Sequence, residues 1–148
     1  MPSAKTAACV TAVSMMSTSV QNVEAPAQVA PKAVVALLHV ADVQRSISFY
    51  QKLGFELGNE PLKNDRGVES FAWMHHGSAA QIMLALTGRP LNPGAQDVMF
   101  YLYVTDMSAF REQVVSSGLA VGEIKYPFWS PNGEFRVDDP DGWAWMVC

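Results

Sequence analysis

The chain has 148 residues, 49% of them hydrophobic and 16% charged, with a formal net charge of −4. This length fits one domain with a sizeable core, and the charge excludes the basic stripe that binding to nucleic-acid backbones requires. Cys9 and Cys148 lie near opposite ends, so no disulfide framework is expected, and no apolar stretch reaches the ~20 residues that span a bilayer.

Residues 1–32 are rich in Ala, Ser, Thr and Val and show neither helical nor strand periodicity. We interpret them as a flexible N-terminal extension of a cytoplasmic protein. A secretory signal is the alternative, because Lys5 precedes a weak apolar run over residues 7–16 and Ala25-Pro26-Ala27 offers a cleavage site. That alternative predicts export.

One pattern occurs twice in the rest of the chain. The sequence Val40-Ala41-Asp42, followed by Gly54 and Gly58, returns 64 residues later as Val104-Thr105-Asp106, followed by Gly118 and Gly122. A duplicated unit that cannot bury its own apolar face must stack on its copy. We therefore predict a single domain over residues 33–148, built from modules at 33–88 and 96–148 with a cleft between them.

The first module reads as strand, helix and three strands. A β-branched apolar run over residues 34–40 predicts a strand buried on both faces. Asp42 then caps a helix that Gly54 ends, and Phe55 with Leu57 begins the next strand. A polar loop at 63–67 precedes strands at 70–75 and 81–86, which a turn at 76–78 joins.

The second module repeats this order. A strand over residues 98–104 is followed by a helix that Asp106 caps and Gly118 ends, and by a strand over 119–126. After a loop at 127–132, strands at 134–138 and 143–147 complete the module. The tetrapeptide Asp139-Pro140-Asp141-Gly142 predicts the turn between them, because Pro fixes φ and Gly takes a positive φ.

Two segments carry a family resemblance. The first module opens with HVADVQRSISFYQKLGFEL and the second closes with GEFRVDDPDGWAWMV. Together they resemble the vicinal oxygen chelate superfamily, which includes glyoxalases, extradiol dioxygenases, fosfomycin-resistance enzymes and bleomycin-resistance proteins. Over residues 33–148 the resemblance implies an α+β fold, in which two βαβββ modules form a cleft-containing half-barrel sheet with helices on the outside.

Metal-dependent members of that superfamily hold a divalent ion with His and Glu side chains from the first and fourth strands of each module. The resemblance places these positions at Val35, Met83, Phe100 and Met146. None of the four offers a nitrogen or oxygen ligand. A register error of one residue gives Ala36, Leu84, Tyr101 or Val147, which include no His or carboxylate either. We expect no metal and no cofactor.

The cleft is expected to be lined with aromatic and Met side chains, which suit planar ligands. Trp145, Tyr101, Tyr103 and Phe135 have the opposite strand parity and are expected to pack under the helices. Glu134 and Arg136 share one strand face, where they form a surface pair or bind an amine and an anionic or carbonyl group. The predicted ligand-binding residues are Val35, His39, Trp73, Met83, Phe100, Leu102, Phe128, Trp129, Glu134, Arg136 and Met146.

Our first functional hypothesis is a metal-free binding protein that resembles bleomycin-resistance proteins and sequesters an aromatic or amphipathic molecule, such as an antibiotic. The resemblance also implies a homodimer. The alternative is a glyoxalase-like lyase or isomerase that works without the family's metal, with His39 as general base and Arg136 as electrostatic stabiliser. A third hypothesis is a regulatory or partner-binding domain that kept the scaffold and lost the site.

Overall fold

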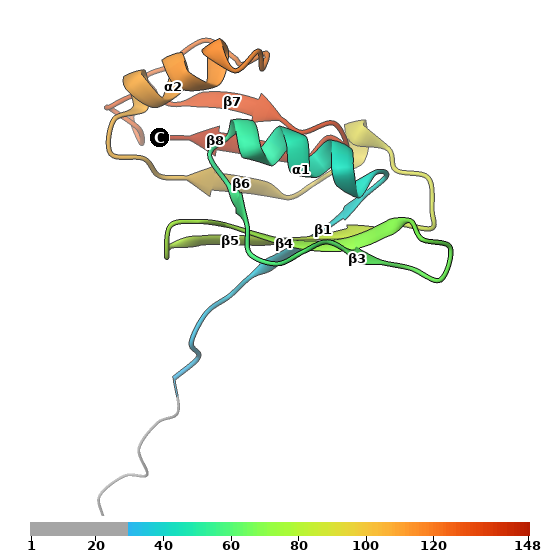
Figure 1. Ribbon diagram of the computed structural model, residues 1–148. Helices are drawn as coiled ribbons and strands as arrows, with labels where there is room; N and C mark the ends of the chain where they lie inside the picture. Colours follow the sequence, from blue (N-terminus) through green and yellow to red (C-terminus); the bar gives the residue numbers. More distant parts are fainter. Residues whose placement is uncertain (1–29) are drawn as a thin grey trace, which may run out of the picture. The chain divides into compact units, whose positions relative to one another are not determined.

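The computed structural model describes residues 30–148, and the predictions for residues 1–29 lie outside this range. Ala33–Cys148 form one compact unit (Figure 1). None of the helices in residues 30–148 is long and apolar enough to cross a membrane. The elements follow the chain as β1 (Ala36–Val40), α1 (Val43–Lys52), β2 (Glu56–Leu57), β3 (Leu62–Lys63), β4 (Glu69–His76), β5 (Ala80–Leu86), the short 3₁₀ helix η1 (Pro93–Ala95), β6 (Met99–Leu102), α2 (Met107–Ser116), β7 (Phe135–Asp138) and β8 (Ala144–Val147).

Both predicted helices and their caps are confirmed. The Asp42 and Asp106 side chains each accept a hydrogen bond from the backbone N–H three residues ahead, at 2.9 Å. Each cap satisfies a donor that the first helical turn leaves unpaired. Gly54 and Gly118 follow the helices with φ of 83° and 85°, the left-handed conformation that glycine adopts without steric cost.

The strands form two sheets, which confirms the α+β class. The first sheet has the order β1-β5-β4-β2, with β3 also paired to β4, and the second has the order β6-β8-β7. In each sheet the module's first strand pairs in parallel with its last strand. Figure 1 shows α1 above the first sheet and α2 above the second. Neither sheet closes into a barrel within the described range.

The strand predicted over residues 119–126 is wrong. The segment follows the edge of β7, where Lys125 and Glu134 exchange two backbone hydrogen bonds and Gly122 donates one to Arg136. The bonded residues on this side, Gly122 and Lys125, are three positions apart, whereas their partners Arg136 and Glu134 are two positions apart. An extra residue on one side interrupts a regular ladder, so only an isolated bridge forms.

In residues 30–148, one hydrophobic core joins the inner faces of both sheets to both helices. At its centre the Tyr50 ring of α1 lies edge-on to Phe55 at 5.8 Å and to Trp145 of β8 at 5.7 Å. Phe135 and Trp145 are buried there, as their parity predicted. Because α1 contacts residues of both modules, neither module forms the core alone.

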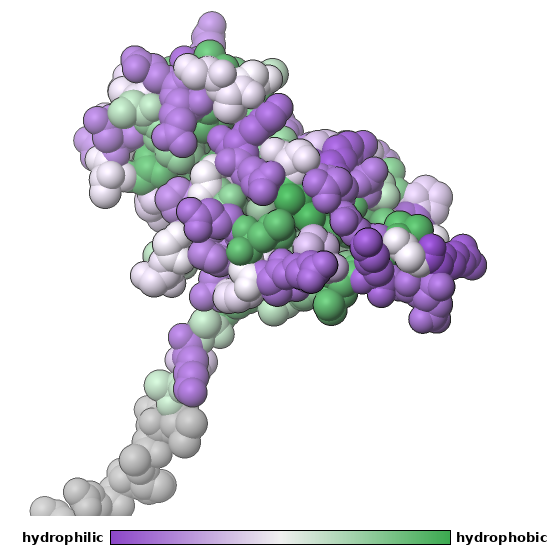
Figure 2. All heavy atoms as spheres, viewed as in Figure 1, coloured by the Kyte–Doolittle hydropathy of each residue, from purple (hydrophilic) through white to green (hydrophobic). Residues whose placement is uncertain are grey.

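The prediction that the first strand is buried on both faces is wrong. In β1, Leu38 and Val40 are buried, whereas Leu37 and His39 are exposed. The strand lies at the edge of its sheet with only one face against the core. Its continuous apolar run therefore does not mean that both faces are buried. In the view of Figure 2, apolar residues also reach the surface between α1 and the first sheet, among polar ones.

Candidate functional site

The face of the first sheet that points away from the core, here called the first outer face, carries apolar and aromatic side chains. Strand pairing aligns Leu37, Met83 and Trp73 in one row across β1, β5 and β4. His39 and Phe71 stand in the next row, on either side of Ala85. Because directly paired residues point to the same side of a sheet, these side chains form one surface.

Trp73 has a defined place on this surface. Its backbone N–H donates to Asn59 Oδ1 at 2.9 Å, and its carbonyl accepts from Gly58 N at 2.8 Å. A Cβ atom on Gly58 would lie only 2.2 Å from the indole ring. Gly58 is therefore the residue that leaves room for the ring.

We expect Gly58→Ala to displace the Trp73 indole and to lower the free energy of unfolding by about 2 kcal/mol, the usual cost of overpacking. Urea denaturation followed by tryptophan fluorescence measures both effects. Gly88→Ala is the matched control, because a Cβ atom there meets nothing within 4 Å. Equal stabilities for the two variants would contradict this packing.

The face of the second sheet that points away from the core, the second outer face, is more polar. Tyr101, Met146 and Arg136 align across β6, β8 and β7. Tyr101 is 48% exposed, and its ring stacks on that of Tyr103 at 6.3 Å. Arg136 is held by Asp138, with 2.8 Å between a guanidinium nitrogen and a carboxylate oxygen. Tyrosine, methionine and an ion pair therefore lie side by side on this face.

The predicted orientation of β6 is wrong. Phe100 packs against the core and stacks on Trp145 at 4.8 Å, and Leu102 is buried. Tyr101 and Tyr103, expected under the helices, are exposed instead. Residues 98–104 are apolar or aromatic at every position, so a period of two cannot choose the buried face. Pairing with β8 determines which face of β6 is buried, because it places Phe100 beside the buried Trp145.

Glu134 lies directly before β7 and is only 6% exposed. It lines a cavity of about 430 Å³ together with Arg136, Met146 and Lys125. The Cys148 thiol lies 4.0 Å from Glu134 Oε2. Burial, with the Glu134 charge adding to it, raises the pKa of this thiol, so Cys148 stays protonated at neutral pH.

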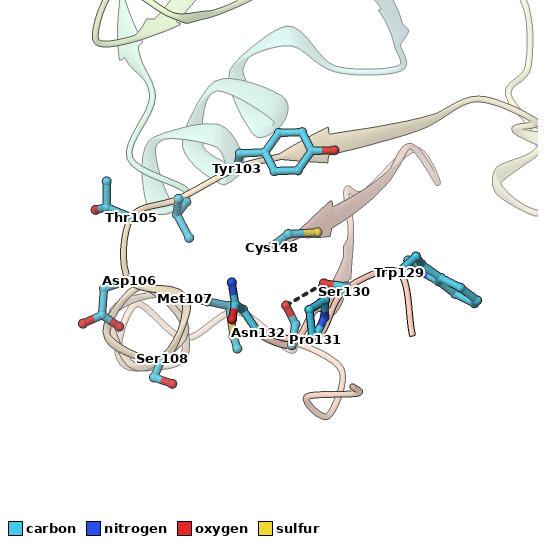
Figure 3. A pocket seen from close by; sticks show the side chains of 12 residues that line it. Tyr103, Thr105, Asp106, Met107, Ser108, Trp129, Ser130, Pro131, Asn132 and Cys148 are labelled. Atoms are coloured by element: carbon cyan, nitrogen blue, oxygen red, sulfur yellow. Dashed lines mark hydrogen bonds between the residues drawn. The ribbon is translucent and has the colours of Figure 1, made fainter. Parts of the chain in front are cut away.

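The loop at residues 127–132 carries Phe128 and Trp129, whose rings meet edge-on at 4.9 Å. Both are exposed, Phe128 by 90%. Trp129 lies at the margin of a hollow of about 500 Å³ that Tyr103 and Cys148 also line (Figure 3). This hollow adjoins the second outer face through Tyr103.

The residues present do not fit the chelated metal ion of the superfamily's metal-dependent members. Val35, Met83 and Met146 have the parity of the outer faces, and Tyr101 takes the place expected for Phe100. None of them is a His or a carboxylate, the donors that such an ion uses.

Other donors do not replace them. His39 and His75 share the first outer face, but they lie two strands apart and in rows about 13 Å apart along the strands. Within residues 30–148, no three His, Cys, Asp or Glu side chains gather where they could hold an ion. No binding or chemical step is therefore assigned to a metal here.

His39 is the catalytic candidate of the alternative hypothesis. Its side chain is exposed, and in the described part of the chain no side chain bonds to the imidazole. Its backbone carbonyl accepts from Trp143 Nε1 at 3.0 Å. A general base needs a group that orients it, so this geometry does not favour the lyase or isomerase.

The structure thus separates the predicted ligand residues into four groups. Val35, His39, Trp73 and Met83 belong to the first outer face. Arg136 and Met146 belong to the second, and the buried Glu134 lines the cavity next to them. Phe128 and Trp129 lie on the exposed loop, whereas Phe100 and Leu102 face the core. Sequence reasoning missed Leu37, Phe71, Tyr101 and Tyr103. For Tyr101 the sequence held no local signal, because its pairing with Met146 is seen only in the folded sheet.

The chain was also compared with known proteins. The sequence profile of the Glyoxalase/Bleomycin resistance protein/Dioxygenase superfamily matches residues 32–147. No curated protein sequence matches the chain.

Solved structures share the fold. A bleomycin-binding protein complexed with bleomycin has a TM-score of 0.64 at 18% identity and covers 79% of this chain and 97% of its own. The bleomycin-binding protein from Streptomyces verticillus, complexed with copper(II)-bleomycin, has a TM-score of 0.59 at 24% identity, over 81% and 97%. A glyoxalase-related enzyme from Clostridium phytofermentans has a TM-score of 0.64 at 11% identity, over 80% and 95%. By its sequence and its fold, the chain belongs to the glyoxalase/bleomycin resistance/dioxygenase superfamily.

Proposed function

We propose that this protein is a small-molecule-binding protein that takes an aromatic or amphipathic ligand, such as an antibiotic, without a bound metal ion. The observation that carries the proposal is the composition of the outer faces. These faces carry the partly exposed side chains of Trp73, Met83 and Met146 and the exposed side chain of Tyr101. The superfamily resemblance implies that metal-dependent relatives place their metal ligands on the same faces. The bleomycin complexes of two proteins with this fold support a binding role.

Apolar burial supplies the affinity in this proposal. Covering ~400 Å² of apolar surface contributes about 10 kcal/mol at 25 cal/mol per Å². Association costs at least about 4 kcal/mol, which leaves a dissociation constant in the tens of micromolar. Tighter binding requires polar contacts, for which Arg136 and Glu134 are the candidates.

We propose further that Val35, His39, Trp73 and Met83 contact the ligand from one face and Met146 and Arg136 from the other. Phe128 and Trp129 form an exposed rim in this proposal. A planar ligand gains most when it is enclosed between two apolar surfaces. The proposal therefore places the two outer faces opposite each other in a homodimer, with one face from each subunit.

The mass of the protein in solution tests the proposed homodimer. β1 and β6 are edge strands of their sheets, and exposed apolar residues lie on or beside them, which is typical of association surfaces. Sedimentation equilibrium at micromolar concentrations is expected to give the mass of two chains. A single-chain mass at all concentrations would contradict a groove between subunits.

The ligand-binding function is tested by titration of tryptophan fluorescence. Bleomycin and the neutral planar probe 1-naphthalenemethanol are added to the purified protein. Saturable quenching is expected with at least one of them, and Trp129→Ala is expected to weaken the response. If neither probe nor a wider set of planar antibiotics binds, the proposal is wrong.

A further inference from the structure

Three carboxylate residues are buried in residues 30–148: Asp139, Asp141 and Glu134. The first two have strong partners. Asp141 pairs with Arg45 at 2.6 Å and accepts from Ala41 N at 3.2 Å. Asp139 accepts three hydrogen bonds, from Tyr50, Asp141 N and Trp143 N. Such partners offset the cost of removing a charge from water.

Glu134 is the exception. It is 6% exposed, and its side-chain partner is the Cys148 thiol at 4.0 Å. A thiol is a weak hydrogen-bond donor. Throughout the described residues, no Lys, Arg or His nitrogen lies within 4.0 Å of this carboxylate. Among these residues the carboxylate therefore has no cationic partner.

The neighbouring cations do not fill this role. Lys125 bonds to Glu134 through the backbone at 2.8 Å, but its side chain is exposed and its ammonium group lies beyond 4.0 Å. Arg136, two residues along β7, is already held by Asp138 at 2.8 Å. The cavity of about 430 Å³ next to Glu134 thus contains an acceptor without a matching donor.

This cavity opens toward the proposed ligand surface. Met146 lines it and also stands in the row with Tyr101 on the second outer face. A ligand lying on Met146 and Tyr101 can therefore direct a substituent to Glu134. An ammonium or amidinium group suits that position, because charge-assisted hydrogen bonds to a desolvated carboxylate are strong.

We propose that the ligand is a cationic aromatic amine and that Glu134 binds its charged nitrogen. This inference rests on the proposed function and specifies the class of ligand. Met146 and Tyr101 contact the aromatic part, and Cys148 adds a weak hydrogen bond to the same carboxylate.

The test compares three probes of one shape and different charge: 1-naphthylmethylamine, 1-naphthalenemethanol and 1-naphthaleneacetic acid. Dissociation constants are measured by isothermal titration calorimetry at pH 7.5. We expect the amine to bind the wild-type protein at least about 10-fold more tightly than the alcohol, and the acid to bind more weakly than either.

The variant Glu134→Gln keeps the side-chain shape and removes the charge. It is expected to reduce the preference for the amine to within about twofold, with affinity for the alcohol unchanged. Glu123→Gln is the matched control, because Glu123 lines the same cavity but is exposed. It loses the same charge and is expected to keep the preference, which separates contact with Glu134 from general attraction by an acidic protein.

Each outcome decides the proposal. If the alcohol binds as tightly as the amine, or the acid binds best, the class of ligand is wrong while the binding function stands. A preference that survives in Glu134→Gln also overturns the role of Glu134. If none of the three probes binds the wild-type protein, this inference and the proposed function both fail. The comparison of the three probes uses the wild-type protein alone, so it tests the class of ligand even if the Glu134→Gln variant does not fold.

Discussion

Replacing Asp139 by Ala is expected to lower the free energy of unfolding by about 4 kcal/mol, because it leaves several buried donors unpaired. Asp139 Oδ2 accepts from the Tyr50 hydroxyl at 2.8 Å, and Oδ1 accepts from the backbone N–H groups of Asp141 and Trp143 at 2.9 and 2.8 Å. Trp145 Nε1 in turn donates to the Tyr50 oxygen at 3.2 Å. One carboxylate thus satisfies three donors and orients a fourth.

The position of Asp139 explains the size of this effect. The residue lies between β7 and β8, yet it holds Tyr50 of α1, 89 residues away in sequence. The adjacent Asp141 holds Arg45 of α1. The turn therefore connects the first helix to the second sheet. Loss of the Asp139 bonds is expected to loosen the core that both modules share, and not only one loop.

Asp138→Ala is the matched control. Asp138 is exposed and pairs with Arg136 at the surface, so its removal is expected to change stability by less than about 0.5 kcal/mol. Urea denaturation of the wild type and both variants measures the difference. A loss of less than about 1 kcal/mol for Asp139→Ala would contradict the role assigned to this network.

Stability is also expected to depend on pH through Asp139. Burial raises its pKa above the ordinary value of 3.8, despite hydrogen bonds from Trp143, Tyr50 and Asp141 that favour the charged form. The folded state therefore holds this proton more tightly than the unfolded state does. The contribution of Asp139 is fully present below pH 3.8 and is lost as the pH rises through the raised pKa.

The side chain in the variant Asp139→Asn stays neutral at every pH. Comparison with this variant therefore isolates the contribution of Asp139 ionisation to the stability. The stability of the wild type relative to that of the variant is expected to fall as the pH rises from about 3.5 to 7. Urea midpoints measured across this range test the direction. A difference that stays constant or increases would show that Asp139 titrates at or below its ordinary pKa.

The second large effect is expected on binding. Trp73→Ala is expected to weaken binding of 1-naphthalenemethanol about 30-fold, since an aromatic side chain at the centre of an interface contributes about 2 kcal/mol. Trp73 shares the middle row of the first outer face with Met83 and Leu37. Its indole stands over Gly58, which fixes its place.

Calorimetry is the appropriate measurement for this variant, because the substitution removes one of the fluorophores. Val115→Ala, at an exposed apolar position on α2, controls for the loss of an apolar side chain. It is expected to bind the probe as the wild type does. An unchanged dissociation constant for Trp73→Ala would remove the first outer face from the ligand site.

Local signals made much of the fold predictable. Asp42 and Asp106 cap the helices and Gly54 and Gly118 end them because each signal acts within one turn of chain. The 64-residue repeat places these signals in register in both modules. The superfamily and the α+β class followed from this repeat together with the two quoted segments.

What the sequence did not predict depends on contacts between distant segments. The buried face of β6 is decided by Trp145 of β8, and no alternation within residues 98–104 reveals it. Tyr50 and Asp139 meet only after both modules fold. Glu134 lacks a cationic partner because Arg136 pairs with Asp138 and the Lys125 side chain is exposed. Strand parity does not predict either of these side-chain positions.

The measurement that tests the central proposal most directly is a ligand titration after removal of metal ions. The protein is dialysed against EDTA and titrated with copper-free bleomycin and 1-naphthalenemethanol, with tryptophan fluorescence as the readout. We predict saturable quenching with the same dissociation constant before and after dialysis. Quenching that disappears after EDTA treatment and returns when a divalent ion is added would contradict binding by the outer faces alone.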